Sequence, residues 1–222
     1  FPIEHIYQYA TLVWGERRMT PDEKIVEPRW DYPEGWILLD ARWLCASQVA
    51  GEQIPAGQNI VPEYDRKLLE HYPKVRDTPL TGDLRKDGYY STPYVFYQIY
   101  VRSGALPVFL AARRELLHYR EKQIIHEGRD RGRSTVNAKP RYLYMQAMAA
   151  DYFLTGDPRT LEAAGFMAEF LEKNFSPEDA FYKRSRTNFW TERKQAACFL
   201  GHLTYYEMTG DKKHLKIADA YM

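Results

Sequence analysis

Four glycines recur along the chain at an almost constant interval, and each follows a long apolar stretch. They are Gly51, Gly104, Gly156 and Gly210, and the intervals between them are 53, 52 and 54 residues. A fixed period of this size is typical of stacked supersecondary units, none of which can bury its apolar face alone. The period therefore predicts one repeat domain over residues 1–222 rather than two independent domains.

The two clearest copies of the repeat share a Thr-Gly-Asp phrase, at residues 155–157 and 209–211. Glycine suits the left-handed residue that closes a helix, and an aspartate directly after it accepts hydrogen bonds from the free amides of the next helix. Pro158 then falls at the first helical position, where its missing N–H costs nothing. Each phrase therefore predicts a helix end followed at once by a helix start.

The segment before each glycine is apolar nearly all round, whereas the segment after it has one charged face. The first pattern is typical of a buried helix and the second of an outer helix with one solvated side, where Arg113 and Arg120 interrupt the stripe. We therefore expect an all-α fold of helical hairpins, opened by an outer helix over residues 2–14. The expected inner helices are 35–50, 92–103, 140–154 and 191–208, and the expected outer helices are 63–72, 107–123, 158–173 and 212 onward.

Hairpins of this kind place their connections at two opposite rims. The inner helices are then mutually parallel, so all the tight glycine turns lie at one rim and all the long return segments reach the other. The Thr-Gly-Asp phrases and the period resemble the six-hairpin (α/α)6 toroid superfamily of carbohydrate-active enzymes. It includes glycoside hydrolases, polysaccharide lyases and N-acylglucosamine epimerases. The resemblance implies a toroid with its active cleft at the rim of the long loops.

The length of the chain bears on the toroid. Six hairpins of this period need on the order of 320 residues, whereas 222 residues hold four hairpins and a fraction. We therefore expect an incomplete toroid and a chain that is a fragment of a longer protein.

Composition excludes several classes of function. A net charge of +1 argues against a general nucleic-acid binder, and no run of 18 apolar residues exists, so no membrane span is expected. No His or Cys pair has metal-ligand spacing and no glycine-rich phosphate loop occurs, so no metal or cofactor is predicted. Cys45 and Cys198 are expected to be buried free thiols. Compartment and oligomeric state stay open, with a secreted or periplasmic location slightly favoured.

Aromatic residues make up 15% of the chain, with 18 tyrosines, and many of them fall in the long return segments beside arginines. Aromatic faces stack on sugar rings, and the arginine fork suits a carboxylate or sulfate. The expected partner is therefore a carbohydrate, and an acidic one is favoured. The candidate substrate-binding residues are Trp30, Asp87, Tyr94, Arg133, Arg186, Asn188 and Trp190.

Two chemistries fit such a rim. Hydrolysis of a glycosidic bond needs a pair of carboxyl groups, for which the sequence offers Glu192 and the aspartates at positions 31 and 87, with Asp40 and Asp151 deeper along inner helices. Elimination on a uronic acid needs a group that neutralises the carboxylate and a base. Resemblance to toroid lyases assigns the first role to Asn or Arg and the second to Tyr or His. The candidate catalytic residues are Tyr90, Asn137, Arg141 and Glu192.

Two other functions stay open. A sugar epimerase on the same fold would need a pair of histidines on inner helices, and only His202 lies on one; we expect His202 to be a core residue. The other possibility is a non-catalytic helical-repeat scaffold that binds glycan or protein. In that case the rim carboxylates would lie far apart.

Overall fold

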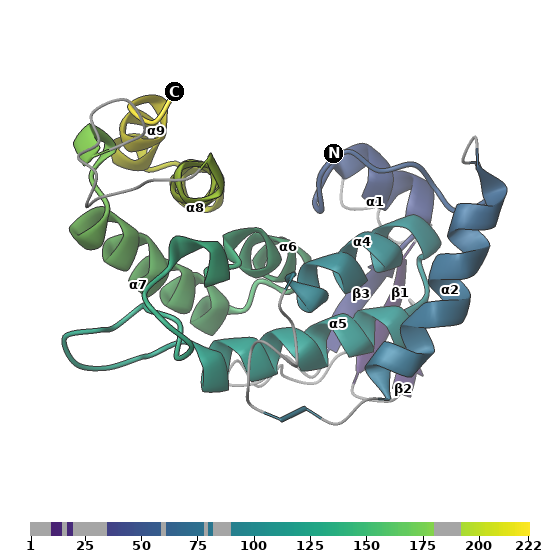
Figure 1. Cartoon of the computed structure of the whole chain (residues 1–222). Coiled ribbons are helices and arrows are strands. Elements are labelled where there is room, and N and C mark those ends of the chain that lie inside the picture. Colours follow the sequence, from purple (N-terminus) through teal and green to yellow (C-terminus); the bar gives the residue numbers. More distant parts are fainter. Residues whose placement is uncertain are drawn as a thin grey trace.

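The computed structural model describes residues 10–14, 17–19, 35–58, 61–77, 80–81, 90–179 and 192–222, and these are mainly helical. In Figure 1 the helices follow an arc that runs from α2 (Pro62–Arg76) to α9 (Lys212–Asp219). The mainly helical architecture expected from the sequence is thereby confirmed.

A small antiparallel sheet lies at the start of the described chain, and the sequence analysis did not predict it. Its order is β2 (Arg17–Met19), β1 (Ala10–Trp14), β3 (Gly35–Leu39). Leu12 of β1 pairs with Met19 on one side and with Ile37 on the other. The helix expected over residues 2–14 is therefore wrong for β1, whose run Thr-Leu-Val-Trp is rich in residues that favour strands.

The inner helix expected over residues 35–50 is also replaced, by β3 and a short helix α1 (Ala41–Ser47). Asp40 caps α1 by accepting a hydrogen bond from the backbone N–H of Arg42 at 2.8 Å. Gln48, with φ 57°, takes the left-handed position that ends α1. Gly51 has the spacing of the repeat but comes three residues later, so it does not close this helix.

Helix α2 extends four residues beyond the expected end at residue 72, and the six α-helices described after it form three hairpins close to the expected positions. In each hairpin the glycine at the turn has a positive φ and donates its N–H to the carbonyl four residues earlier, as a left-handed helix cap requires. The pairs are α4 (Thr92–Ser103) with α5 (Leu106–His118), α6 (Met145–Thr155) with α7 (Pro158–Asn174), and α8 (Glu192–Thr209) with α9. A π-helical turn over Tyr119–Gln123 continues α5, and a 3₁₀ turn over Pro140–Tyr142 precedes α6.

The two Thr-Gly-Asp phrases fold alike. Asp157 accepts a hydrogen bond from the N–H of Arg159 at 2.9 Å, and Asp211 accepts one from the N–H of Lys213 at 2.9 Å. In both copies the threonine hydroxyl donates to the carbonyl four residues earlier. The local prediction of a helix stop followed by a helix start is thus correct at both places.

Helices α4, α6 and α8 contact one another in that order, and the outer helices α5, α7 and α9 each pack on their hairpin partner. Residues that lie between these helices are almost fully buried and make one continuous core. Its largest apolar members include Tyr97, Tyr100, Phe109, Met148, Met167 and Leu171.

A network of buried charges joins the α4–α5 hairpin to the α6–α7 hairpin. The Arg113 guanidinium bonds to the carboxylates of Asp151 and Asp157, and Arg120 bonds to Asp157 at 2.7 Å. The hydroxyl of Thr160 donates to Asp151 at 2.6 Å. Arg113 and Arg120, placed by the sequence on a solvated face, are therefore core residues, because carboxylates from the next hairpin compensate their charge.

Candidate functional site

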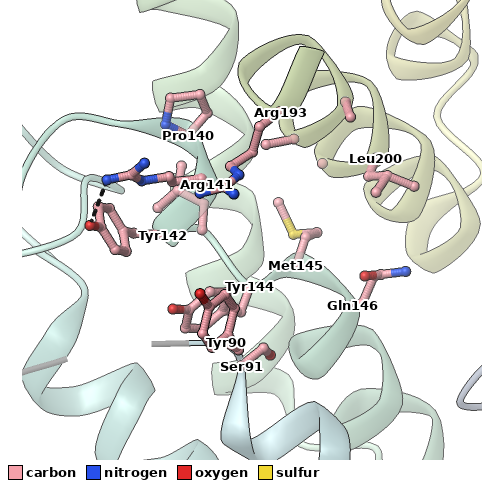
Figure 2. A pocket seen from close by; sticks show the side chains of 14 residues that line it. Tyr90, Ser91, Pro140, Arg141, Tyr142, Tyr144, Met145, Gln146, Arg193 and Leu200 are labelled. Atoms are coloured by element: carbon pink, nitrogen blue, oxygen red, sulfur yellow. Dashed lines mark hydrogen bonds between the residues drawn. The ribbon is translucent and has the colours of Figure 1, made fainter. Parts of the chain in front are cut away.

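A cavity of about 300 Å³ lies where the N-terminal ends of α6 and α8 approach the residues that precede α4. Its wall combines tyrosine rings, arginine side chains and aliphatic groups (Figure 2). The lining residues are Tyr90, Ser91, Pro140, Arg141, Tyr142, Leu143, Tyr144, Met145, Gln146, Arg193, Ala196, Ala197, Leu200 and Gly201.

The cavity therefore lies at the N-terminal ends of α4, α6 and α8. Tyr90 and Ser91 end the segment before α4, and residues 140–144 end the segment before α6. Arg193 belongs to the first turn of α8, directly after the fourth return segment. Residues 90–91, residues 140–144 and the first turns of α8, far apart in the sequence, thus lie at one cavity.

Two of the candidate catalytic residues line the cavity. Tyr90 is 80% exposed at its edge. The guanidinium of Arg141 donates to the hydroxyl of Tyr142 at 3.0 Å and stands 4.9 Å from the centroid of the same ring. Figure 2 shows this bond and shows Arg193 extending from α8 toward the segment that carries Arg141. Two cationic side chains from different elements are therefore brought to one wall.

Three other candidates lie away from the cavity lining. Tyr94 is half-buried in the first turn of α4, and burial raises the pKa of its phenol. Arg133 belongs to the loop that follows the π-helical turn, and it forms an ion pair with Asp130 at 3.3 Å. The side-chain oxygen of Asn137 accepts the N–H of Lys139 at 2.8 Å, in a turn that leads to Pro140. The structure does not bring these three to Arg141.

The other candidates fall largely outside the described residues. Glu192 is the first residue of α8, but its side chain is not among the described ones. The candidates that lie wholly outside are Trp30, Asp87, Arg186, Asn188 and Trp190.

The two deeper carboxylates offered for hydrolysis have structural roles instead. Asp40 caps α1 at the protein surface. Asp151 is fully buried, where it accepts hydrogen bonds from Arg113, Tyr97 and Thr160. Among the cavity-lining residues that the structure describes, none is an aspartate or a glutamate.

Sequence reasoning missed several lining residues, of which Tyr142, Tyr144 and Ser91 are the most informative. The two tyrosines lie in an apolar stretch that the sequence analysis assigned to a buried helix, and they are in fact buried while facing the cavity. Ser91 has φ 61° and ψ 57°, a conformation uncommon for a residue with a Cβ and frequent at functional sites. No local signal in the sequence marks such a backbone.

His202 and His214 form a buried pair, and neither is among the described residues that line the cavity. The Nδ1 atoms of His202 and His214 are 2.9 Å apart and both side chains are buried. Burial, together with the neighbouring His214, lowers the pKa of His202 to about 4, and burial also lowers the pKa of His214. The expectation of a core histidine at position 202 agrees with this burial.

Comparison of the chain with protein-family models, with curated proteins and with solved structures finds no match. In the part of the chain that the structure describes, no helix is both long and apolar enough to cross a membrane. Within the same residues, no group of three His, Cys, Asp or Glu side chains is placed to hold a metal ion. Both cysteines are free and buried, as expected.

Proposed function

We propose that this protein is a carbohydrate-active enzyme of the toroid kind that binds an acidic polysaccharide or oligosaccharide in the cavity before α4, α6 and α8. The observation that carries the proposal is that Tyr90, Ser91, residues 140–144 and helix α8 meet at one cavity with tyrosine rings and two arginines on its wall. The rim on which the cavity lies is the one where the resemblance to six-hairpin enzymes places the active cleft.

The chemistry of the wall suits a sugar ring that bears a carboxylate. Tyr90 is exposed at the edge and offers an aromatic face for stacking. Arg141 is oriented by its hydrogen bond to Tyr142, so one side of its fork is held and less conformational freedom is lost when it binds an anion. Arg193 adds a second cation from α8.

Within this class the described lining suits elimination, because it includes the cations and tyrosines that this reaction uses. In the proposed step Arg141 neutralises the uronate carboxylate and Tyr90 removes the proton from the adjacent carbon. The C–H electron pair becomes the new carbon–carbon double bond as the glycosidic C–O bond breaks. The leaving oxygen takes from Tyr90 the proton that Tyr90 removed, and the products are an unsaturated uronate and a shortened chain.

The epimerase alternative loses support because the partner of His202 is His214 on the outer helix α9, and both are buried. Hydrolysis retains Glu192 as a candidate acid, at the start of α8 next to Arg193. A non-catalytic glycan-binding role would need the same cavity without turnover.

The test is to incubate the protein with oligosaccharides of galacturonate or glucuronate, with a neutral glucan as the control. Elimination produces the ultraviolet absorbance of an unsaturated uronate, whereas hydrolysis produces new reducing ends without it. We expect Arg141→Ala to lower kcat/KM by roughly 10- to 100-fold, and Arg133→Ala, which removes a cation away from the cavity lining, to leave it unchanged.

The mutant pair Arg141→Ala and Glu192→Gln separates the two reactions. Loss of activity only in Glu192→Gln contradicts elimination and favours hydrolysis. Binding of the acidic glycan without any product supports the non-catalytic role. If the protein binds none of these glycans, the proposal is refuted.

A further inference from the structure

Tyr119 is not one of the residues that line the cavity, but it bonds to two that are, Tyr142 and Tyr144. It is the first residue of the π-helical turn that continues α5, and its side chain is 1% exposed. Its ring packs on that of Tyr144 with centroids 5.1 Å apart. The ring therefore reaches from α5 to the segment that leads into α6.

The hydroxyl of Tyr119 makes two backbone hydrogen bonds in this segment. It donates to the carbonyl of Tyr142 at 2.9 Å and accepts the N–H of Tyr144 at 2.9 Å. These two residues flank Leu143, where the chain leaves the 3₁₀ turn and enters α6. One hydroxyl thus fixes the backbone on both sides of the junction.

We call residues 141–144 the wall segment, because all four line the cavity. Both backbone groups that bond to Tyr119 belong to this segment. The backbone of Tyr142 is held by Tyr119, and the hydroxyl of Tyr142 in turn holds the Arg141 guanidinium. The position of Arg141 therefore depends, through one intermediate residue, on a hydroxyl in the core.

Tyr119 and Arg120, adjacent residues of the π-helical turn, bond to different partners. Tyr119 bonds to the wall segment, whereas Arg120 bonds to Asp157 and Thr160 at the start of α7. A π turn is wider than an α-helical turn and occurs often at functional sites. Both side chains are buried, so replacing either by a residue that needs solvent would lower the stability of the fold.

We propose that Tyr119 is a positioning residue for the cavity, and that its hydroxyl holds the wall segment in the form that binds the acidic group of the ligand. This inference rests on the proposed function, since it assigns the wall segment to ligand binding. Tyr119 itself does not touch the ligand and acts only through Tyr142 and Tyr144.

The test compares Tyr119→Phe with Tyr97→Phe. Both substitutions remove a hydrogen-bonded hydroxyl from a buried tyrosine, but the hydroxyl of Tyr97 bonds to Asp151 and not to the wall segment. Amide hydrogen exchange of residues 140–146 is measured together with affinity for an oligogalacturonate and an oligoglucuronate by calorimetry. Both are measured at a temperature where all three proteins are folded.

Tyr119→Phe is expected to speed exchange in residues 140–146, but not in α7, and to weaken binding by roughly 3- to 10-fold. Tyr97→Phe is expected to leave affinity unchanged. Unchanged exchange at residues 140–146 in Tyr119→Phe would overturn the structural part of the inference. Faster exchange with unchanged affinity would overturn the positioning role. If the wild-type protein binds neither probe, the proposed function and the positioning role both fall, while the exchange result still decides whether Tyr119 holds the segment.

Discussion

The two interfaces between successive hairpins have the same backbone design and opposite side-chain chemistry. The first interface joins α5 to the α6–α7 hairpin, and the second joins α7 to the α8–α9 hairpin. When the two Thr-Gly-Asp phrases are aligned, Asp151 corresponds to Tyr205 and Thr160 corresponds to His214. At these places the first interface buries a carboxylate and a hydroxyl, whereas the second has the half-buried ring of Tyr205 and the buried ring of His214.

At the first interface Asp157 has two functions. It caps α7, and it also receives Arg113 and Arg120 from the preceding hairpin. Burial opposes its ionisation, but the hydrogen bonds from these arginines lower the pKa of the carboxyl below its ordinary value. The same carboxylate therefore serves both as the helix cap and as the partner of the ion pairs.

At the second interface the equivalent cap, Asp211, is exposed and only caps α9. The space between α7 and α8 is filled by Tyr205, whose ring meets that of His214 edge-on at 4.8 Å, and Gly165 lets the helices approach there. The Thr-Gly-Asp phrase therefore specifies the turn in both hairpins. Whether its aspartate also forms ion pairs depends on the side chains that the neighbouring helices place beside it.

The largest expected difference is between Asp157→Ala and Asp211→Ala. Removing Asp157 deletes the buried carboxylate that Arg113 and Arg120 share and leaves the buried Arg120 only the half-exposed Glu121, so the free energy of unfolding should fall by about 3–5 kcal/mol. Removing Asp211 deletes only a cap and should lower it by about 1 kcal/mol. Urea denaturation measures both, and equal losses would mean that the buried network adds nothing beyond capping.

A smaller difference is expected in the response to acid. The pKa of His202 is about 4 in the folded protein, against an ordinary value of 6.5. Between these values the unfolded chain binds a proton that the folded chain does not, so the free energy of unfolding falls as the pH falls. The full loss is on the order of 3 kcal/mol and is complete below pH 4.

His202→Met tests this assignment, because the equivalent residue in the preceding hairpin is the buried Met148. The variant should lose most of the pH dependence between pH 6.5 and 4 in denaturation experiments. Asp157 contributes to the free energy of unfolding over a different pH range. Because its pKa is lowered in the folded protein, its contribution begins to be lost only as the pH falls below the ordinary pKa of 3.8. A variant that retains the wild-type slope above pH 4 would show that other groups cause it.

The smallest effect concerns the glycine of the second interface. A Cβ at Gly165 would lie 3.1 Å from the hydroxyl of Tyr205. In Gly165→Ala alone, the gain in helix propensity is therefore opposed by crowding against Tyr205. In the Tyr205→Phe background the crowding is removed, and the free energy of unfolding should rise by roughly 0.5–1 kcal/mol. Thermal unfolding of the two single variants and the double variant measures the coupling, and strict additivity would contradict the contact.

The sequence predicted local structure better than structure that depends on distant partners. The hairpin helices were found because their glycine caps, aspartate caps and apolar faces are encoded within a few residues, as at Gly156 and Asp157. The sheet was missed because β1 is completed by β3, more than 20 residues away in the chain. Gly51 fitted the period, but Gln48 ends the helix, and spacing alone does not distinguish the two.

The candidate site was predicted in part. Tyr90 and Arg141 were reached from the argument that long segments meet at one rim, and both line the cavity. Arg113 was read as a surface residue because its compensating carboxylates lie 38 and 44 positions later in the chain. Tyr119 carried no signal at all, since its role depends on two backbone atoms of another hairpin.

The π-helical turn at residues 119–123 has a consequence for efforts to redesign this protein. Adjacent positions in it serve the wall segment through Tyr119 and the first interface through Arg120. Deleting one residue from the turn would restore regular α-helical pitch and rotate the residues beyond it by about 100°. The hydrogen bond to the wall segment and an ion pair of the first interface thus come from neighbouring residues of a single turn, and libraries that vary the cavity should keep its length and its first two residues constant.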